Sequence, residues 1–200
     1  MIHHFYHIYA DGKWQEPLRE HMEAVTRHGL DSVLNGFHVG VVGSGDNRLA
    51  ALAALDKYEV PYSIAAEAEQ GWEQVTMNRI WSFVQGRNGL VLYGHTKGAA
   101  NPTPINHAWR KSMIYYNVVN WQTATGHLFD QSIDTVGTHW CNNAFWGGTY
   151  WWARASYLAR LQPPLSESRF QAEEWIGSGQ PRIVDMNPGW PDFTRFVTEW

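Results

Sequence analysis

The loop from His95 to Gly98 concentrates more chemically useful groups than any other part of the sequence. It places an imidazole, a hydroxyl and an ammonium in succession, directly after the short apolar run at residues 89–94. These side chains can donate hydrogen bonds or carry positive charge toward a ligand. We therefore expect Thr96 and Lys97, with their neighbours His95 and Asn101, to bind a substrate rather than to form a solvated turn.

The first half of the chain alternates short apolar runs with amphipathic segments. We expect strands at residues 2–10, 37–44, 60–68 and 89–94, and helices at 14–30, 46–55 and 72–83. Such alternation predicts right-handed crossovers and an α/β fold, in which a mainly parallel sheet is sandwiched between helices. Ligands bind beyond the carboxyl ends of strands in such sheets. The loop at His95 follows the fourth strand, so it lies where a site is expected.

The second half continues the pattern with less regularity and is rich in aromatic residues. We expect a helix that Asn106 caps and that runs to about Val119, then a strand at residues 134–140. A Gly-Gly turn, a Trp pair and a helix follow at residues 142–161, and residues 162–169 form a connecting loop. A short helix at 170–179 and a last strand within 182–191 complete the fold. No long linker divides the chain, so we expect one domain over residues 1–200.

Composition narrows the classes of function. The net charge of -4 argues against a broad basic face for non-specific nucleic-acid binding. Cys141 is the only cysteine, so no intramolecular disulfide can form. The amino terminus lacks the features of a signal peptide, and no apolar run reaches membrane-spanning length. We expect a cytoplasmic protein.

Familiar catalytic motifs are absent from the sequence. It has no Walker phosphate loop, dinucleotide fingerprint, HExxH, GxSxG or zinc-binding cysteine spacing. Strand alternation places His3 and His7 on one face and His4 on the other, so these histidines cannot converge on one metal ion. We interpret them as structural.

Several separated motifs together carry a resemblance to a known family. They are FYHIY, YGHTKGA, NHAWRKSMIYYN, DTVGTHW, FWGGTYWWARASYLARL and RFQAEEWIG, in this order from residue 1 to about 178. In that order they resemble small bacterial and viral glycosyltransferase-like proteins. The resemblance implies a GT-A-like, Rossmann-like fold and transfer of a sugar from a nucleotide-diphosphate sugar to a hydroxyl acceptor. Residues 1–105 would hold the nucleotide sugar and 106–200 the acceptor, in the host cytoplasm if the chain is viral.

The resemblance leaves the acceptor open. A glycan, a small molecule or a modified nucleic-acid base fits, and the acidic net charge favours the first two. Nucleic acid is therefore expected as an acceptor only. A non-catalytic sugar- or nucleotide-binding module on the same scaffold is the alternative function.

The loop at His95 departs from the wider GT-A pattern. Many such enzymes carry an Asp-x-Asp motif there that holds a divalent metal ion on the donor, whereas this chain has GHTKG. Lys97, the Thr96 hydroxyl and loop amides can stabilise the departing diphosphate instead. We expect a metal-independent mechanism, although binding of manganese or magnesium by His95, alone or with a distant carboxylate, remains an alternative.

Two carboxylates are candidates for the catalytic base. The match to the family pattern places Glu173 at its acidic position, and a base must take the proton of the acceptor hydroxyl if the transfer inverts configuration. The alternative for Glu173 is a carboxylate that the helix dipole favours. Asp134, at the start of its strand, is a second candidate for the base or for an acceptor contact.

Aromatic and glycine residues supply the remaining candidates for substrate contacts. Tyr6 and Tyr9 lie near one strand end, where they can stack on a nucleotide base, contact its ribose or simply pack. Indole faces can pack on sugar rings, and glycine lets a backbone approach a ligand closely. The candidates of this kind are Trp109, Gly147, Gly148, Trp151 and Trp152. Because Trp151 and Trp152 are adjacent, we expect at least one of them in the core.

Overall fold

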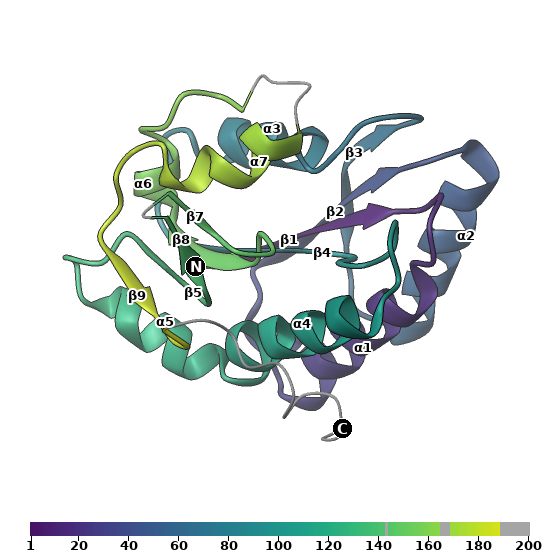
Figure 1. The fold of residues 1–200 in the computed structure, drawn as a ribbon, viewed down its shortest axis with the longest axis horizontal. Coiled ribbons are helices and arrows are strands. Elements are labelled where there is room, and N and C mark those ends of the chain that lie inside the picture. Colours follow the sequence, from purple (N-terminus) through teal and green to yellow (C-terminus); the bar gives the residue numbers. More distant parts are fainter. Residues whose placement is uncertain (143, 165–168, 189–200) are drawn as a thin grey trace.

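The computed structural model describes residues 1–142, 144–164 and 169–188 and arranges them in layers around one central sheet (Figure 1). The seven-stranded sheet has the order β3-β2-β1-β4-β8-β5-β9. Its strands are β1 (Ile2–Tyr9), β2 (Gly36–Val42), β3 (Ser63–Ala68), β4 (Leu90–His95), β5 (Thr135–Gly137), β8 (Trp151–Arg154) and β9 (Ile183–Asp185). A small two-stranded sheet pairs β6 (Trp140–Cys141) with β7 (Phe145–Trp146).

Helices cover both faces of the central sheet. One face packs against α1 (Gln15–Arg27), α2 (Gly45–Leu55), α4 (Pro104–Ile114) and α5 (Trp121–Phe129). The other packs against α3 (Gln74–Val84), α6 (Ala155–Leu158) and α7 (Arg169–Glu174). Figure 1 shows α3, α6 and α7 on one side of the sheet and α1, α4 and α5 on the other. None of the helices in the described ranges has the length and apolar character needed to cross a bilayer.

Strand alternation assigns the core residues to the two faces. On β1, Tyr6 and Ile8 join the core under α1 and α4, whereas Phe5 joins the core under α3. On β8, Trp152 faces the first core and Trp151 the second. This separation follows from the period of two in a strand, because successive side chains point to opposite faces.

The sheet is mostly parallel, as expected from the sequence. β1 pairs in parallel with both β2 and β4, β2 pairs in parallel with β3, and β5 pairs in parallel with β9. β8 is the exception, since it runs antiparallel to its neighbours β4 and β5. β1 and β4 are neighbouring parallel strands in the middle of the strand order. Their carboxyl ends therefore lie side by side at the same edge of the sheet.

Helix α1 shows why the first crossover forms where it does. Leu18, Met22 and Val25 are buried at helical spacing, which gives the helix one apolar face toward the sheet. Glu16 in the first turn and Arg27 in the last complement the helix dipole. Gly29, at φ +67°, turns the chain away from the helix end.

Three expected elements differ in detail. Thr103, not Asn106, caps α4, because its hydroxyl accepts from the Asn106 amide and Pro104 begins the helix. The helix expected to end near Val119 continues through a π-helical stretch (Tyr115–Val119) into α5. The strand expected at residues 134–140 divides into β5 and β6, with His139 at φ 62° between them.

The end of the chain agrees with the expectation where it is described. A short helix, α7, precedes a 3-10 turn (Trp175–Gly177), and β9 closes the sheet within the predicted range. Part of the expected connecting loop, residues 165–168, lies outside the described residues, as do residues 189–191 of the expected last segment.

A chain of buried polar groups crosses the core below α1. His4 Nδ1 lies 3.2 Å from the Leu92 carbonyl, His4 Nε2 lies 2.7 Å from His21 Nε2, and the Tyr150 hydroxyl contacts His21 Nδ1. Every group is satisfied if both rings are neutral and each donates toward the Leu92 carbonyl. Burial lowers the pKa of His4 to about 3 and that of His21 well below its ordinary value, so both rings are neutral at pH 7.

These buried histidines predict a loss of stability in mild acid. The pKa of His7 is also lowered, to about 4, mainly by burial. As pH falls below about 6.5, these histidines become protonated in the unfolded chain but stay neutral in the folded chain. The free energy of unfolding should therefore fall by about 1.4 kcal/mol per pH unit per histidine. Urea denaturation at pH 7, 6 and 5, followed by tryptophan fluorescence, measures this. His7→Asn should give a shallower slope, and a stability that does not change from pH 7 to 5 would contradict the assignment.

Candidate active site

A cavity opens beyond the carboxyl ends of β1 and β4, where the loops that follow these strands meet the start of α3. Its volume is about 130 Å³. The described residues that line it are His7, Tyr9, Gly71, Trp72, Glu73, His95, Thr96, Lys97, Gly98, Ala99, Ala100, Asn101 and Asn106. The loop predicted from the sequence therefore does form one wall of a cavity at the predicted edge of the sheet.

The loop after β4 is held to the end of β1 by its own backbone and by one hydroxyl. The Thr96 amide donates to the His7 carbonyl at 3.0 Å, and Thr96 Oγ1 accepts from the Tyr9 amide at 2.9 Å. The Ala99 amide donates back to the Thr96 carbonyl, and Gly98 adopts φ +86° to allow this tight turn. The amides of Gly98 and Ala100 have no acceptor in the described part of the chain, and both residues line the cavity.

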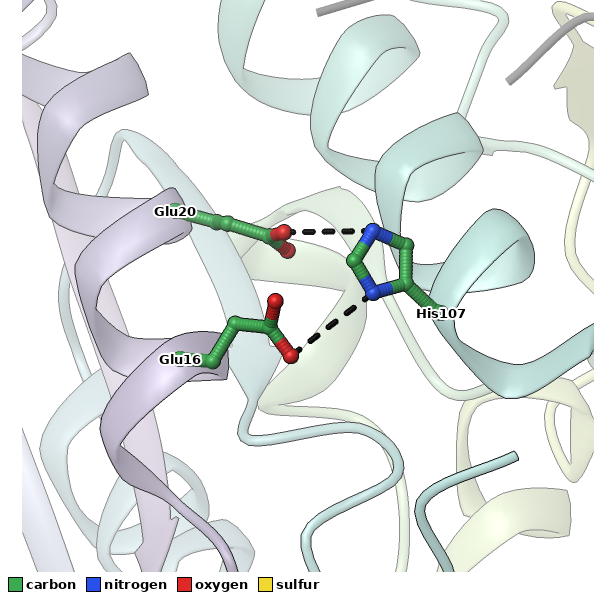
Figure 2. A group of neighbouring side chains, drawn as sticks. All are labelled: Glu16, Glu20 and His107. Carbon is green, nitrogen blue, oxygen red and sulfur yellow. Dashed lines mark ion pairs between the residues drawn. The ribbon is translucent and has the colours of Figure 1, made fainter. Parts of the chain in front are cut away.

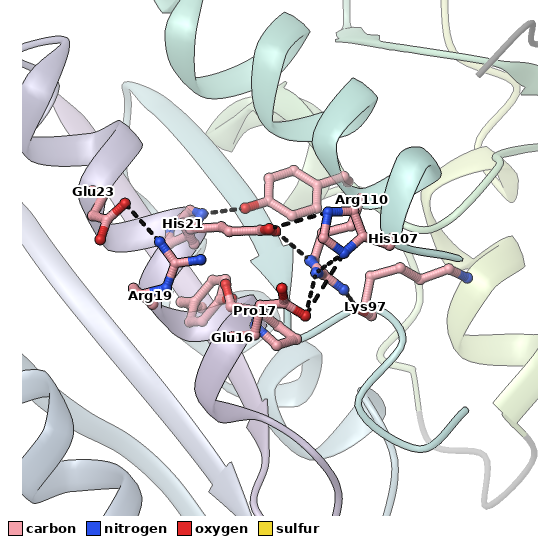
Figure 3. A network of polar contacts seen from close by, with 11 residues as sticks. Glu16, Pro17, Arg19, His21, Glu23, Lys97, His107 and Arg110 are labelled. Atoms are coloured by element: carbon pink, nitrogen blue, oxygen red, sulfur yellow. Dashed lines mark hydrogen bonds and ion pairs between the residues drawn. The ribbon is translucent and has the colours of Figure 1, made fainter. Parts of the chain in front are cut away.

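Arg110 of α4 supports the same loop from below. Its Nη1 donates to the Lys97 carbonyl at 3.0 Å, and its Nε donates to Glu20 Oε2 of α1 at 2.7 Å. Figure 3 shows Arg110 next to Lys97 and Glu16. Glu20 is the second carboxylate that pairs with the guanidinium. The Arg110 side chain is buried, so this link between α1, α4 and the loop is shielded from water.

Lys97 is one of the residues that line the cavity, and its side chain packs on the ring of Trp109, which does not line it. Its Nζ lies 4.3 Å from the centroid of the Trp109 ring, a cation-π contact. Trp109 comes from α4, one residue before Arg110. The predicted substrate-binding residues Lys97 and Trp109 are thus brought together.

A buried ion pair also lines the cavity. His95 Nδ1 lies 3.0 Å from Glu73 Oε1, and His95 Nε2 donates to the Gly148 carbonyl at 2.8 Å. Both ring nitrogens therefore face acceptors, an arrangement that fits an imidazolium paired with a carboxylate. Burial raises the pKa of the Glu73 carboxyl, but the hydrogen bond and charge of His95 lower it more strongly, to well below its ordinary value.

His7 of β1 lines the cavity as well. It lies opposite His95 in the register between β1 and β4, and its Nδ1 lies 2.8 Å from the Thr76 hydroxyl of α3. Its lowered pKa keeps the ring neutral. The predicted placement of the amino-terminal histidines on the two faces of β1 is confirmed. His4 contacts His21 of α1, whereas His7, on the other face, contacts Thr76 of α3, and His3 contacts His38.

Two aromatic side chains flank the mouth of the cavity. Tyr9, at the end of β1, and Trp72, just before α3, have ring centroids 6.4 Å apart and planes inclined by 22°. The Trp72 side chain is 40% exposed, an unusual exposure for an indole in this protein. Tyr9, predicted from the sequence, therefore belongs to the cavity.

Other predicted contact residues occupy different places. Asn101 lines the cavity, and the Gly148 carbonyl holds His95, so that this glycine acts through its backbone. Gly147 is buried beside Trp109. Tyr6 is fully buried and stacks on His21 at a centroid distance of 4.0 Å, so it packs in the core rather than contacting a nucleotide.

The Trp pair of β8 requires a correction. Trp151 and Trp152 are both 0% exposed, so neither can contact a sugar. Trp152 Nε1 donates to the Asn117 carbonyl at 2.8 Å, and Trp151 packs on Tyr93 and Trp175. We expected at least one of the two indoles in the core, and both lie there, because β8 is buried on both faces.

The two predicted carboxylate bases do not line the cavity. Asp134 precedes β5 at the opposite edge of the sheet, where its carboxylate pairs with Arg182 at 3.1 Å and with Arg160 at 3.4 Å. Those arginines lower its pKa against the opposing effect of burial, and they give it a structural role. Glu173 lies on α7, which packs near β7, and its charge raises the pKa of Cys141, after the larger effect of burial.

One group of side chains has the spacing of a metal site, but the contacts that it already makes do not suit a metal ion. Glu16, Glu20 and His107 place ligand atoms within 4.8 Å of one another (Figure 2). Arg110 already donates to both carboxylates, and His107 lies 3.4 Å from Glu20 and 3.7 Å from Glu16. A guanidinium thus occupies the position that a cation would take, so these residues do not fit a metal ion as they stand. Among the described residues lining the cavity, Glu73 is the only carboxylate.

Sequence reasoning missed Glu73, Trp72 and His7 as cavity residues. The signal was present, because Gly71, Trp72 and Glu73 follow the third strand and the same rule places that loop at the carboxyl edge. Trp72 instead falls at the start of the helix expected at residues 72–83. His7 was interpreted as structural, and its bond to Thr76 agrees with that interpretation while its ring still lines the cavity.

Comparison with known proteins gives a family without an assigned activity. Residues 5–174 match the family described as a domain of unknown function, DUF8361. The chain belongs to the DUF8361 family. No curated protein matches this DUF8361 chain.

Solved structures similar to the DUF8361 chain are distant in sequence. A crystal structure of Rv0371C from Mycobacterium tuberculosis H37Rv, in complex with manganese, has a TM-score of 0.51 at 11% identity, over 94% of this chain and 88% of that one. This likeness shows a shared fold alone. A nucleotidyl transferase from Methanothermobacter thermautotroptrophicus, Mth528, has a TM-score of 0.48 at 13% identity, over 96% and 88% of the two chains. At that TM-score the likeness supports no statement about activity.

The link through Arg110 predicts a large effect on the stability of the DUF8361 chain. Arg110→Met should lower the free energy of unfolding by about 3–5 kcal/mol, because it leaves the mostly buried Glu20 carboxylate and the Lys97 carbonyl without their donor. The double variant Arg110→Met with Glu20→Gln should recover part of this loss. Urea denaturation of both variants measures the difference, and a double variant no more stable than Arg110→Met would contradict the pairing.

Proposed function

We propose that this chain is a metal-independent, GT-A-like glycosyltransferase that moves a sugar from a nucleotide-diphosphate donor to a hydroxyl acceptor. One observation carries the proposal. The Thr96 hydroxyl, the Lys97 ammonium and the amides of Gly98 and Ala100 lie on one loop that lines a cavity beyond the carboxyl ends of two central parallel strands. The acceptor can be a glycan, a small molecule or a modified nucleic-acid base.

The chemistry of the loop matches the needs of a diphosphate. Phosphate oxygens accept hydrogen bonds, and amides, a hydroxyl and an ammonium donate them. Groups held in place before the reaction stabilise the charge that develops on a leaving group most effectively. Hydrogen bonds from Thr96 to β1 and from Arg110 to the Lys97 carbonyl hold this loop in place.

The Lys97 ammonium must leave the Trp109 ring to reach a phosphate, and the magnitudes favour that exchange. A cation-π contact contributes roughly 0.5–2 kcal/mol. A hydrogen bond to a charged group contributes roughly 1.5–3 kcal/mol. The long, flexible lysine stem allows the movement without a change in the backbone. The Lys97 ammonium therefore contacts the Trp109 ring when no donor is bound.

The volume of the cavity indicates which part of the donor it encloses. At about 130 Å³, it is smaller than the roughly 300–1,000 Å³ typical of sites that enclose a whole drug-sized ligand. The cavity therefore suits phosphate and an adjoining ring. The nucleoside would extend along the edge of the sheet.

The donor set of the cavity favours catalysis without a metal ion. A divalent cation such as manganese or magnesium usually takes several oxygen ligands, including carboxylates. The described lining residues provide one carboxylate, and its Oε1 already binds His95. Manganese is part of the similar mycobacterial structure, so a test with and without manganese belongs to any assay.

A non-catalytic binding module is the second candidate, and the position of the carboxylates favours it. Asp134 pairs with arginines at the opposite edge of the sheet, and Glu173 lies on α7 outside the cavity. Loss of a base would leave donor binding intact while transfer stops. Release of the nucleotide separates an enzyme from a module.

A thermal-shift panel of UDP, GDP, ADP and CDP, their glucose conjugates and the four nucleoside triphosphates tests the proposal. A ligand at 100 times its Kd stabilises the folded state by about 2.7 kcal/mol, which raises Tm by several degrees. Lys97→Met should weaken binding of the stabilising nucleotide about 10- to 100-fold, because one charge-assisted hydrogen bond is lost. Lys57→Met, at an exposed site on α2's following turn, makes the same charge change and should have no effect.

The outcomes of this panel separate the candidates. Stabilisation by a diphosphate sugar without manganese, followed by slow release of the diphosphate, supports a glycosyltransferase. Saturable binding without release supports the module, and release of pyrophosphate from a triphosphate would identify a nucleotidyl transferase instead. If only manganese allows binding, the metal-independent mechanism is wrong. If Lys97→Met binds as well as the wild type, the loop is not the phosphate site.

A further inference from the structure

One oxygen of the buried Glu73 carboxylate faces no partner in the described part of the chain. Glu73 Oε1 binds His95 Nδ1 at 3.0 Å, whereas Oε2 is buried without a hydrogen-bond donor. The side chain is 9% exposed and lines the cavity. A buried acceptor without a donor costs free energy, so such an atom normally has a partner in the functional state.

The charge of the carboxylate determines what that partner can be. His95 holds Glu73 ionised, since it lowers the carboxyl pKa more than burial raises it. An ionised carboxylate accepts hydrogen bonds and donates none. The partner of Oε2 must therefore carry a proton or a positive charge, which excludes a phosphate oxygen.

The surroundings of Glu73 favour a hydroxyl over a metal ion. His95 uses both of its ring nitrogens, and His7 Nδ1 binds Thr76. Glu73 is the only carboxylate among the described lining residues, whereas manganese and magnesium usually take several oxygen ligands, including carboxylates. A single hydroxyl needs only one acceptor, so Oε2 alone suffices for it.

The residue before Glu73 supplies the second half of a sugar site. Trp72 lines the same cavity, and its indole is 40% exposed and inclined by 22° to the Tyr9 ring. A flat apolar face next to a carboxylate suits a ring that has apolar C–H faces and hydroxyl edges. Sugars combine these two properties.

The geometry points to a subsite that binds the hydroxylated sugar ring of the donor, with Glu73 Oε2 accepting from a ring hydroxyl and Trp72 packing on the ring face. This assignment rests on the proposed function, because it places the transferred sugar beside the phosphate loop. In this subsite Glu73 binds and selects the sugar through its buried Oε2 atom. The His95 imidazolium orients Glu73 and balances its charge next to the diphosphate.

Isothermal titration calorimetry tests the subsite through a ratio of dissociation constants. For UDP, GDP, ADP and CDP, the Kd of each diphosphate is divided by the Kd of its glucose, galactose, mannose and N-acetylglucosamine conjugates. At least one conjugate should bind the wild type about tenfold more tightly than its parent diphosphate. Glu73→Gln places an amide where the carboxylate was and should reduce that ratio about fivefold, with the affinity for the parent diphosphate nearly unchanged.

Two further variants keep the test decisive. Glu69→Gln makes the same change at an exposed site outside the cavity and should keep the wild-type ratio. Trp72→Ala changes an exposed side chain, so it should fold even if loss of the His95 pair destabilises Glu73→Gln. Trp72→Ala should also lower the ratio of dissociation constants.

The failures of the two proposals are distinguishable. If diphosphates bind but no conjugate binds more tightly, or if Glu73→Gln and Trp72→Ala both keep the wild-type ratio, the sugar subsite is wrong while the phosphate loop stands. If no diphosphate or conjugate binds at all, the proposed function and the subsite are both wrong.

Discussion

The parallel pairing of β1 with β4 is the constraint on which the candidate site depends. It aligns His7 with His95 and brings the carboxyl ends of two central strands to one edge. The Thr96 amide and hydroxyl then continue the pairing beyond the strands, by bonding the His7 carbonyl and the Tyr9 amide. The loop after β4 is thus an extension of the sheet's own hydrogen bonds, which fixes its position more tightly than a free loop allows.

Two glycines show how the sheet accommodates its buried polar groups. A Cβ at Gly94 would collide with the Tyr150 ring, and a Cβ at Gly40 would collide with the Thr76 hydroxyl. Tyr150 ends the chain of groups through His21 and His4, and Thr76 holds His7. Glycine within a strand normally weakens it, but here each one gives a polar side chain the room to reach its partner. The buried polar groups therefore depend on backbone positions on neighbouring strands.

The sequence predicts the alternating fold and the position of the loop at His95 well because both depend on local patterns. The period of two in the strands and the apolar stripe of α1 are visible in any short window, and the edge rule places His95 to Gly98 correctly. What it missed depends on contacts between distant segments. Nothing near Asp134 indicates Arg182, 48 residues away, and the edge rule that could have placed Glu73 at the cavity does not indicate its pairing with His95. Trp151 and Trp152 were wrongly predicted as substrate contacts, because the sequence does not distinguish an indole that packs in a core from one that packs against a ligand.

If the cavity binds a diphosphate as proposed, the Glu73–His95 pair limits how it can neutralise the charge of that ligand. The pair is neutral overall, so among the described lining residues Lys97 is the only source of net positive charge. A diphosphate leaving group carries more than one negative charge, and one ammonium does not balance it. The remaining stabilisation must come from dipoles, and the amides of Gly98 and Ala100 are the dipoles that this chain supplies at the loop. Their direction is fixed by the positive φ of Gly98 and by Arg110 holding the neighbouring carbonyl. In the proposed function, the loop geometry therefore contributes more than the lysine to stabilising the diphosphate.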